Sequence, residues 1–156
     1  MTPGIVTVHR CALSSPAAES LIAALNAELS GLYPEPGATH FRLEPDEVTD
    51  GRGAFVVAWL DGIPIGCGAV RRLDQTSAEL KRMYVAPAGR GRGIGGRLLS
   101  ALEDEARQLG VRRLLLETGI RQHAALALYA RAAFTPIPPF GEYADTPTSV
   151  CLGKSL

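Results

Sequence analysis

A glycine-rich turn between two regular segments constrains this chain more than any other feature. Residues 90–96 read Arg-Gly-Arg-Gly-Ile-Gly-Gly, after a strand-like run at 79–85 and before a helical run at 98–109. Glycines let the main chain approach a ligand closely, and the first N–H groups of a helix have no acceptor within it. Two arginines add positive charge, so the turn is typical of a pyrophosphate-binding site. The alternative is an ordinary glycine-rich connection with solvated arginines.

The composition fits one compact domain, residues 1–156. The chain has 156 residues, of which 46% are hydrophobic, enough for one core and not clearly for two. Sixteen basic residues balance sixteen acidic ones. No overall field therefore favours nucleic acid or an anionic membrane as a partner, and phosphate recognition has to be local.

The cysteines and the N-terminus indicate where such a protein works. Cys11, Cys67 and Cys151 are odd in number and lack the spacing of a disulfide framework or a metal site, so neither is expected. The first ten residues contain no long apolar run, and no segment approaches the roughly 18 apolar residues of a membrane span. We expect a soluble, cytoplasmic protein.

Capping and turn residues divide the chain into strands and helices. Ser15 and Pro16 begin a helix that ends near Gly31, and Asp61-Gly62 forms the turn of a hairpin. The expected elements are strand 5–8, helix 16–31, strands 54–60, 63–70 and 78–85, helix 94–109, strand 113–118, helix 122–132, and short strands 134–137 and 149–153. This order predicts an α+β fold, with a mixed, mostly antiparallel central sheet flanked by helices. One parallel strand–helix–strand unit surrounds the glycine turn.

The strand at 78–85 interleaves charged with apolar residues. The charged residues of this strand are Glu79, Lys81 and Arg82, and the apolar and aromatic residues between and after them are Leu80, Met83, Tyr84 and Val85. This pattern predicts that the strand is not buried on both faces and that one side meets ligand or solvent.

The glycine spacing also allows a dinucleotide-binding site. Gly91, Gly93 and Gly96 satisfy G-x-G-x-x-G, and Glu117 lies about twenty residues on, where a Rossmann fold places its ribose-binding acid. Against this alternative, residues 86–89 separate the strand from the glycines, the strand is half charged, and antiparallel strands precede the unit. A Walker loop is excluded because no Gly-Lys-Ser/Thr follows.

The remaining order resembles the GNAT superfamily, the general amine N-acetyltransferases that use acetyl-CoA. Their signature of Arg or Gln, two residues, Gly, one residue, then Gly or Ala is met by Arg90, Gly93 and Gly95. A later family motif of Asn, Ala, Tyr and Gly-Phe is matched by Gln122, Ala125, Tyr129 and Ala133-Phe134. Gln122 thus replaces the usual Asn, and Ala133 replaces the usual Gly. Because glycine readily takes a positive φ at a helix end, Ala133 has either to adopt that unfavourable φ or to end the helix differently.

The resemblance implies a set of cofactor-binding residues for acetyl-CoA. In the family, the main chain at Met83, Tyr84 and Val85 pairs with the pantetheine arm, and an N–H near Val85 polarises the acetyl carbonyl. The pyrophosphate is held by the backbone of Arg90, Gly91, Arg92, Gly93, Ile94, Gly95 and Gly96. Gln122, Ala125 and Tyr129 complete the cofactor side.

Two catalytic candidates follow. Glu79 lies four residues before Met83 and six before Val85, so in a regular strand it shares their face. In part of the family a glutamate at this distance ahead of the cofactor-binding stretch accepts the proton of the amine, and the resemblance implies that role for Glu79; the alternative is a surface carboxylate paired with a nearby cation. Tyr129 stands where the family places the acid that protonates the CoA thiolate, and a core tyrosine is its alternative. His123 and Glu117 are weaker candidates, for which solvation and structural pairing are the commoner roles.

The acceptor side rests on aromatic and basic residues. Tyr33, Phe140 and Tyr143, with Trp59, are candidates for an aromatic wall, although each has an ordinary core explanation. A set of basic residues would favour an acceptor with a carboxylate if they face the cleft: Arg71, Arg72, Lys81 and Arg82.

The sequence therefore predicts a GNAT-like enzyme that transfers an acetyl group from acetyl-CoA to a primary amine of a small molecule, by direct attack in a ternary complex. A homodimer is compatible with this prediction. Two alternatives stay open at this point: a CoA-binding sensor module without turnover, and a dinucleotide-binding oxidoreductase.

Overall fold

The computed structural model describes residues 4–34 and 43–156. Its helices are α1 (Pro16–Leu32), α2 (Ile94–Gln108) and α3 (His123–Arg131). Its strands are β1 (Val6–Arg10), β2 (Gly53–Leu60), β3 (Ile63–Arg72), β4 (Ser77–Val85), β5 (Arg113–Gly119), β6 (Thr135–Pro136) and β7 (Ser149–Ser155). Among these residues no helix is long and apolar enough to cross a membrane.

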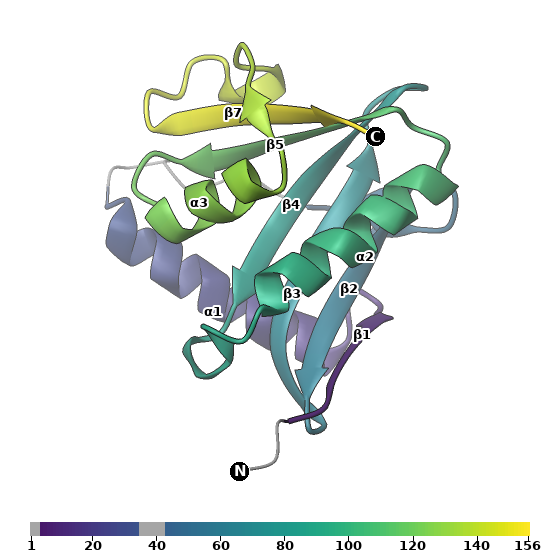
Figure 1. The fold of residues 1–156 in the computed structure, drawn as a ribbon, viewed down its shortest axis with the longest axis vertical. Coiled ribbons are helices and arrows are strands. Elements are labelled where there is room, and N and C mark those ends of the chain that lie inside the picture. Colours follow the sequence, from purple (N-terminus) through teal and green to yellow (C-terminus); the bar gives the residue numbers. More distant parts are fainter. Residues whose placement is uncertain (1–3, 35–42) are drawn as a thin grey trace.

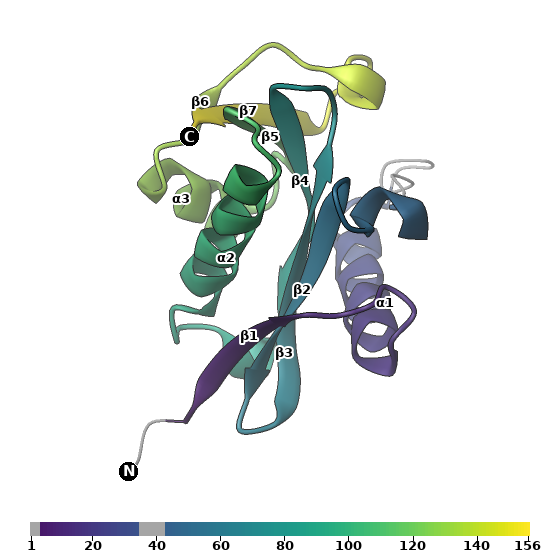
Figure 2. The same ribbon diagram turned by 90° about the vertical axis from the view of Figure 1, so that its right-hand side faces the viewer.

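The strands form one mixed sheet with helices on both faces. Its order is β1-β2-β3-β4-β5-β7-β6, and only the β4–β5 pair is parallel among the pairs of the described strands. Helix α1 covers one face, and α2 and α3 cover the other, as the side view shows (Figure 2). The parallel unit is β4-α2-β5, so the predicted fold class is confirmed.

Local sequence accounts for the ends of these elements. The Ser15 hydroxyl accepts a hydrogen bond from the Ala18 N–H at 3.2 Å and Pro16 is the first helical residue, so α1 begins as predicted. Asp61 and Gly62 both have positive φ, which is the geometry of a tight hairpin turn between β2 and β3. Gly110, at a φ of 81°, ends α2.

The sheet separates two clusters of buried side chains. The cluster beneath α2 and α3 contains Leu98, Leu102 and Leu116, and the cluster beneath α1 contains Leu21, Phe55 and Val57. The two faces of the sheet are therefore distinguishable by which cluster a side chain joins.

Strand β4 differs from the sequence-based expectation, because it is buried on both faces over residues 77–81. Glu79 is fully buried and Lys81 is only 9% exposed. The alternation of charged and apolar residues is typical of a half-exposed strand, but here the buried charges are compensated by neighbouring charges of opposite sign. The pattern alone could not reveal those partners.

Strands β4 and β5 separate after a short parallel stretch. Their register runs from Ser77 opposite Arg113 to Leu80 opposite Leu116, and no pair follows among the described residues. Beyond this point the strands diverge (Figure 1), so the side of β4 that faces β5 is open from Lys81 to Val85. This opening positions the candidate active site.

Candidate active site

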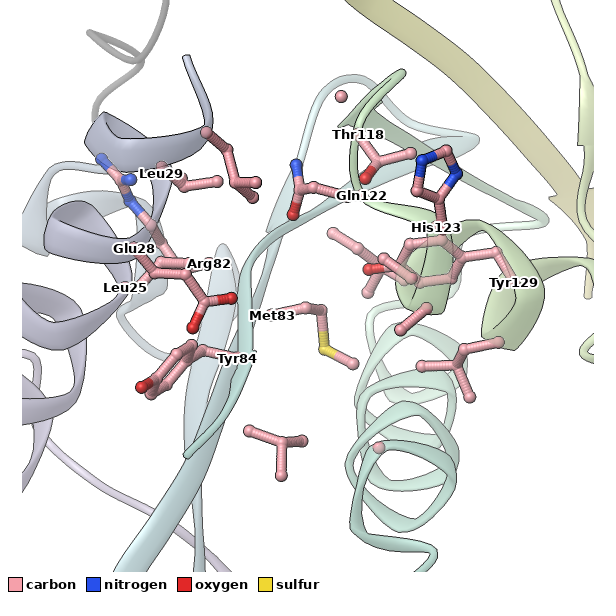
Figure 3. A pocket seen from close by; sticks show the side chains of 18 of the residues that line it. Leu25, Glu28, Leu29, Arg82, Met83, Tyr84, Thr118, Gln122, His123 and Tyr129 are labelled. Carbon is pink, nitrogen blue, oxygen red and sulfur yellow. The ribbon is translucent and has the colours of Figure 1, made fainter. Parts of the chain in front are cut away.

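A cleft of about 590 Å³ occupies the gap between the diverging strands. Its walls come from the C-terminal half of α1, the end of β4, the glycine turn, the end of β5 and helix α3. Figure 3 shows α1 and α3 on opposite sides of the cleft, with β4 between them. The cleft therefore passes from one face of the sheet to the other.

The glycine turn forms one end of the cleft. Gly91 and Gly93 have φ values of 77° and 73°, a region that side chains with a Cβ rarely enter. Gly93 is the N-cap of α2, and the first helical hydrogen bond runs from the Arg97 N–H to the Gly93 carbonyl. The N–H groups of Ile94, Gly95 and Gly96 precede that bond and have no acceptor within the helix. The turn thus offers aligned donors to an anion.

The two arginines of the turn do not act alike. The Arg90 guanidinium donates to the Val85 carbonyl at 3.1 Å and to Glu28 of α1 at 2.5 Å, so its side chain ties the turn to α1 across the cleft. The exposed Arg92 is not among the described residues that line the cleft. Arg92 is thus the one residue of the predicted pyrophosphate-binding turn that does not line the cleft among the described residues.

A β-bulge in β4 rearranges the faces of the strand. The register with β3 shifts between Cys67 and Ala69, and Arg82 has a φ of 58°. Before the bulge, Lys81 lies opposite Ala69; after it, Tyr84 lies opposite Cys67, so Lys81 and Tyr84 point to the same side, toward α1. Figure 3 shows Met83 directed to the other side.

The prediction that Glu79 shares a face with Met83 and Val85 is therefore wrong. Glu79 lies opposite Arg71 and belongs to the α1 face, whereas Met83 and Val85 pack against the core beneath α2. The prediction assumed an uninterrupted period of two, and the bulge adds one residue to it. Glu79 is not among the described residues that line the cleft.

Glu79 is the centre of a buried network. Its Oε1 accepts hydrogen bonds from Arg71, at 2.9 Å from Nε, and its Oε2 accepts one from the Tyr143 hydroxyl at 2.5 Å. Arg71 also donates to Glu47 at 2.6 Å. Burial, and then the Glu79 carboxylate, raises the pKa of Tyr143. Tyr143 does line the cleft, so Glu79 reaches the cleft through this tyrosine.

Tyr129 of α3 points its hydroxyl into the cleft (Figure 3). Its ring is 4% exposed and packs edge-on against Phe134, with centroids 5.7 Å apart. Burial, with a smaller contribution from Glu117, raises the pKa of the phenol, which therefore stays protonated at neutral pH. A protonated donor inside a cleft is what a leaving thiolate requires.

Glu117, near the end of β5, lines the cleft on the α1 side of the sheet. Its Oε2 accepts a hydrogen bond from the Ser149 hydroxyl at 2.6 Å. Burial is the largest cause that raises the pKa of Glu117, the Ser149 hydrogen bond opposes it, and the Glu79 carboxylate adds to the rise. Glu117 is thus a carboxylate in contact with the cleft, whereas Glu79 lies behind it.

Comparison with known proteins supports one family for this arrangement. The model of the acetyltransferase (GNAT) family matches residues 18–134. A protein of Azospirillum brasilense named IAA acetyltransferase is 40% identical over 153 residues, covering 97% of this chain and 98% of its own. The chain belongs to the GNAT acetyltransferase family.

Solved structures agree with this assignment. The structure of a putative acyl-CoA N-acyltransferase from Klebsiella pneumoniae covers 97% of this chain and 98% of its own, with a TM-score of 0.82 and 35% identity. A GNAT family acetyltransferase from Elizabethkingia anophelis with acetyl-CoA bound has the same fold, with a TM-score of 0.68 at 22% identity. The protein is thus an acetyltransferase of the family that uses acetyl-CoA, and the dinucleotide-binding alternative is wrong.

The GNAT acetyltransferase has three features that fit acetyl-CoA. The N–H groups at the start of α2 suit a pyrophosphate, and a side chain at Gly96 would meet nothing within 4 Å, so space is free beside them. The open side of β4 offers main-chain partners to an extended amide-bearing arm. Gln122 and Ala125 of the second motif line the same cleft, and Figure 3 shows the Gln122 amide directed into it.

The departure of the acetyltransferase from its family at Ala133 is resolved by the backbone. Ala133 has a φ of 72°, so it takes the left-handed conformation that the usual glycine would supply. The Phe134 N–H donates to the Tyr129 carbonyl at 3.0 Å and the Ala133 N–H to the Ala130 carbonyl at 3.1 Å. These two bonds form a Schellman motif, which ends α3 directly beside Tyr129.

The acceptor side of the enzyme is only partly as predicted. Tyr33 and Tyr143 line the cleft, whereas Phe140 stacks edge-on against Tyr143 from outside it and Trp59 packs against the core under α1. Of the four basic residues, Lys81 and Arg82 line the cleft. Arg71 supports Glu79, and Arg72 donates to the Leu109 carbonyl far from it.

Sequence reasoning missed the contribution of α1 to the cleft. Its wall contains Leu25, Glu28 and Leu29 (Figure 3). Leu25 and Leu29 lie on the apolar side of the helix, for which a core position is the ordinary interpretation, and nothing in their spacing distinguishes a cleft wall from a core. Glu28 has the sequence character of an ordinary surface carboxylate. Arg121 was missed as well; its guanidinium lies over the Tyr33 ring, 5.0 Å from the centroid.

Proposed function

We propose that this enzyme transfers the acetyl group of acetyl-CoA to a primary amine of a small molecule by direct attack while both substrates are bound. One observation carries the proposal: the cleft crosses the sheet where β4 and β5 diverge. The start of α2 and Tyr129 lie toward one face, and Lys81, Glu117 and Tyr143 toward the other. Two substrates that enter from opposite faces meet in the gap.

The residues of the first face hold the donor. Acetyl-CoA supplies a thioester, which carries the acetyl carbonyl and a thiolate leaving group. The first N–H groups of α2 bind the pyrophosphate, and the open side of β4 from Met83 to Val85 pairs with the extended arm. Tyr129, protonated at neutral pH, gives its proton to the departing sulfur.

We propose Glu117 as the group that accepts the amine proton, in place of Glu79. Glu117 lines the cleft, and its Oε2 accepts a hydrogen bond from the Ser149 hydroxyl. Both oxygens of Glu79 are engaged, by Arg71 and by Tyr143, so Glu79 positions Tyr143. The raised pKa of Glu117 brings it closer to the working pH, which favours proton transfer.

The proposed reaction is a substitution at the acetyl carbon, in which the amine replaces the CoA thiolate. The amine nitrogen attacks the acetyl carbon, forming the C–N bond, and the C–S bond breaks. Glu117 takes a proton from nitrogen and Tyr129 gives one to sulfur. Exchange with solvent returns both residues to their starting states.

A thiol-release assay with a panel of primary amines tests this function. The wild-type enzyme should release CoA in an amine-dependent manner, and Glu117→Gln should lower kcat/KM by about 10²- to 10⁴-fold. Glu79→Gln, which changes a carboxylate outside the cleft, is the matched comparison and should lose less.

The reverse order of losses, with both variants equally stable, would return the proton-accepting role to Glu79. If no amine releases CoA while CoA still binds, the enzyme proposal fails and a sensor role is supported.

A further inference from the structure

Charged side chains gather at the acceptor end of the cleft, on the α1 side of the sheet. Lys81 and Arg82 come from β4 at the bulge, and Arg121 comes from the segment between β5 and α3. Two carboxylates line the cleft on the same side: Glu28 of α1, which is paired with Arg90, and Glu117 near the end of β5. The cations Lys81 and Arg82 of β4 thus lie across the cleft from the carboxylate Glu117 of β5.

The bulge brings two neighbouring cations to the cleft. In a regular strand Lys81 and Arg82 would point to opposite faces. With Arg82 at a φ of 58°, both residues line the same cleft, and the Arg82 Nη1 donates to Asn26 of α1 at 3.1 Å. Burial lowers the pKa of Arg82, which remains a cation at any working pH.

Lys81 is a buried cation at the floor of this region. Its side chain is 9% exposed, and its ammonium lies 3.9 Å from Glu142, at the outer limit of an ion pair with an exposed partner. A substrate carboxylate placed here would meet a cation that has already lost most of its water. Charge-assisted hydrogen bonds are stronger in such surroundings than at the surface.

Glu117 supplies the opposite charge across the gap. Lys81 and Glu117 lie on the same face of adjacent, diverging strands, and the electrostatic interaction between them is one cause that lowers the pKa of Glu117. An acceptor that binds with an ammonium group and a carboxylate would pair with both; its ammonium loses one proton to solvent before the attack, and Glu117 takes the second as the C–N bond forms. Its amine would then lie beside the group that accepts the proton.

We propose that the acceptor is an amino carboxylate, an amino acid or a close analogue, with its carboxylate toward Lys81 and Arg82 and its amine toward Glu117. This rests on the acetyltransferase function proposed above. Lys81 and Arg82 are specificity-determining residues in this arrangement. Tyr33, the C-cap of α1, lines the same cleft, with the Arg121 guanidinium over its ring.

Matched substrate pairs test the inference. The common L-amino acids are each compared with their own carboxamide in the thiol-release assay with saturating acetyl-CoA. The carboxamide amine has the lower pKa and is neutral to a larger extent, so chemistry alone favours the amide. A preference of about 10-fold or more in kcat/KM for the free acid is expected, because hydrogen bonds to charged groups are stronger than those to neutral groups.

Two variants assign that preference to residues. Lys81→Met keeps the length of the buried side chain and should lower the acid-to-amide ratio of kcat/KM by about 10-fold; Arg82→Gln should lower it in the same direction. Arg113→Met is the matched control, because Arg113 is an exposed cation on β5 that does not line the cleft, and it should leave the ratio unchanged.

Equal use of acids and amides by the wild-type enzyme would overturn the inference, as would an unchanged ratio in folded Lys81→Met or Arg82→Gln. If Lys81→Met does not fold, Arg82→Gln carries the same decision. Amide turnover without acid preference leaves the acetyltransferase function standing. The absence of thiol release with every amine would instead contradict that function itself.

Discussion

Single residues at the cleft owe their roles to neighbours that are far away in the chain. Glu79 is held by Arg71 and Tyr143, and the latter is 64 positions further along. Tyr143 lines the cleft because Glu79 fixes its hydroxyl, so the two act as one unit. A carboxylate that looks like a base in the sequence becomes, in the structure, the support for a tyrosine.

Tyr129→Phe tests the acid role at the scale of one oxygen atom. The pKa of Tyr129 is raised by burial above its ordinary value of about 10, so the phenol stays protonated throughout the neutral range. Removal of the hydroxyl should lower kcat by about 10²-fold and leave the affinity for CoA nearly unchanged. Any alkaline fall of kcat due to this phenol should lie above pH 10 and be absent from the variant.

An acyl donor with a more acidic leaving thiol provides the control, since it needs less protonation and should suffer less from the mutation. Equal losses for both donors, or a loss of stability large enough to explain the lost rate, would leave Tyr129 with a packing role.

At the scale of elements, the start of α2 supplies the anion site. A substitution that blocks it without straining the backbone is available at Gly96, whose added Cβ would meet nothing within 4 Å. Gly93 is unsuitable because its φ of 73° would strain any larger residue. In a helix the Cα–Cβ bond leans toward the N-terminus, so a side chain at 96 extends over the free N–H groups.

Gly96→Leu should therefore weaken CoA binding by about 10-fold or more while the protein stays as stable or becomes more stable, since leucine favours helix over glycine by up to about 1 kcal/mol. Calorimetric titration with CoA and thermal melting measure the two effects. Ser100→Leu, one turn further along α2 and outside the cleft, is the control. Full CoA affinity in folded Gly96→Leu would contradict pyrophosphate binding at this turn.

The end of α3 is strained, and this strain is removable. Ala133 holds a φ of 72° within a Schellman motif, a conformation that glycine adopts freely. Ala133→Gly should raise the free energy of unfolding by roughly 0.5–1 kcal/mol, because the Cβ clash costs about 1–2 kcal/mol and the flexible unfolded chain offsets part of it. Denaturant unfolding measures the change. A less stable variant would show that Ala133 does not hold this conformation in solution.

Most element boundaries were predictable because short-range chemistry sets them. Ser15, the Asp61-Gly62 turn and Gly110 each act on neighbouring residues, and the elements they bound were predicted to within about two residues. The bulge at Arg82 was not predictable, since no local residue type demands it. Its companion is Gly68 on β3, where a Cβ would lie 2.6 Å from the Met83 sulfur. Only the pairing of two strands reveals that relation.

For the site, the glycine turn and the second motif were predictable, and their described residues line the cleft except at Arg92, Ala133 and Phe134. The acceptor side was not, because its residues come from α1, the end of β5 and the segment around Tyr143. Their proximity depends on long-range packing, which periodicity does not encode.

At the scale of the whole molecule, the cysteines support the direct transfer proposed above over a covalent intermediate. A relay through the enzyme needs a nucleophile, and a cysteine acts only as its thiolate. Burial raises the pKa of Cys67 to about 12 and also raises the pKa values of Cys11 and Cys151. None of the three is poised to accept an acetyl group at neutral pH.

Initial-rate kinetics should therefore show intersecting lines when acetyl-CoA and the amine are varied together, because both substrates have to be present in the cleft. The measurement needs only the wild-type enzyme and its best amine. Parallel lines, accompanied by acetylation of the protein in the absence of amine, would indicate a covalent intermediate and contradict the arrangement proposed here.

The early separation of β4 from β5 also bears on how long the protein survives. After Leu80, the side of β4 that faces β5 has no partner in that strand among the described residues, so a donor bound there as proposed would add contacts that the polypeptide itself does not make. A ligand that binds only the folded state adds stability that grows with its concentration. Bound acetyl-CoA should therefore also stabilise the folded enzyme, and we expect its resistance to proteolysis to increase with the concentration of acetyl-CoA.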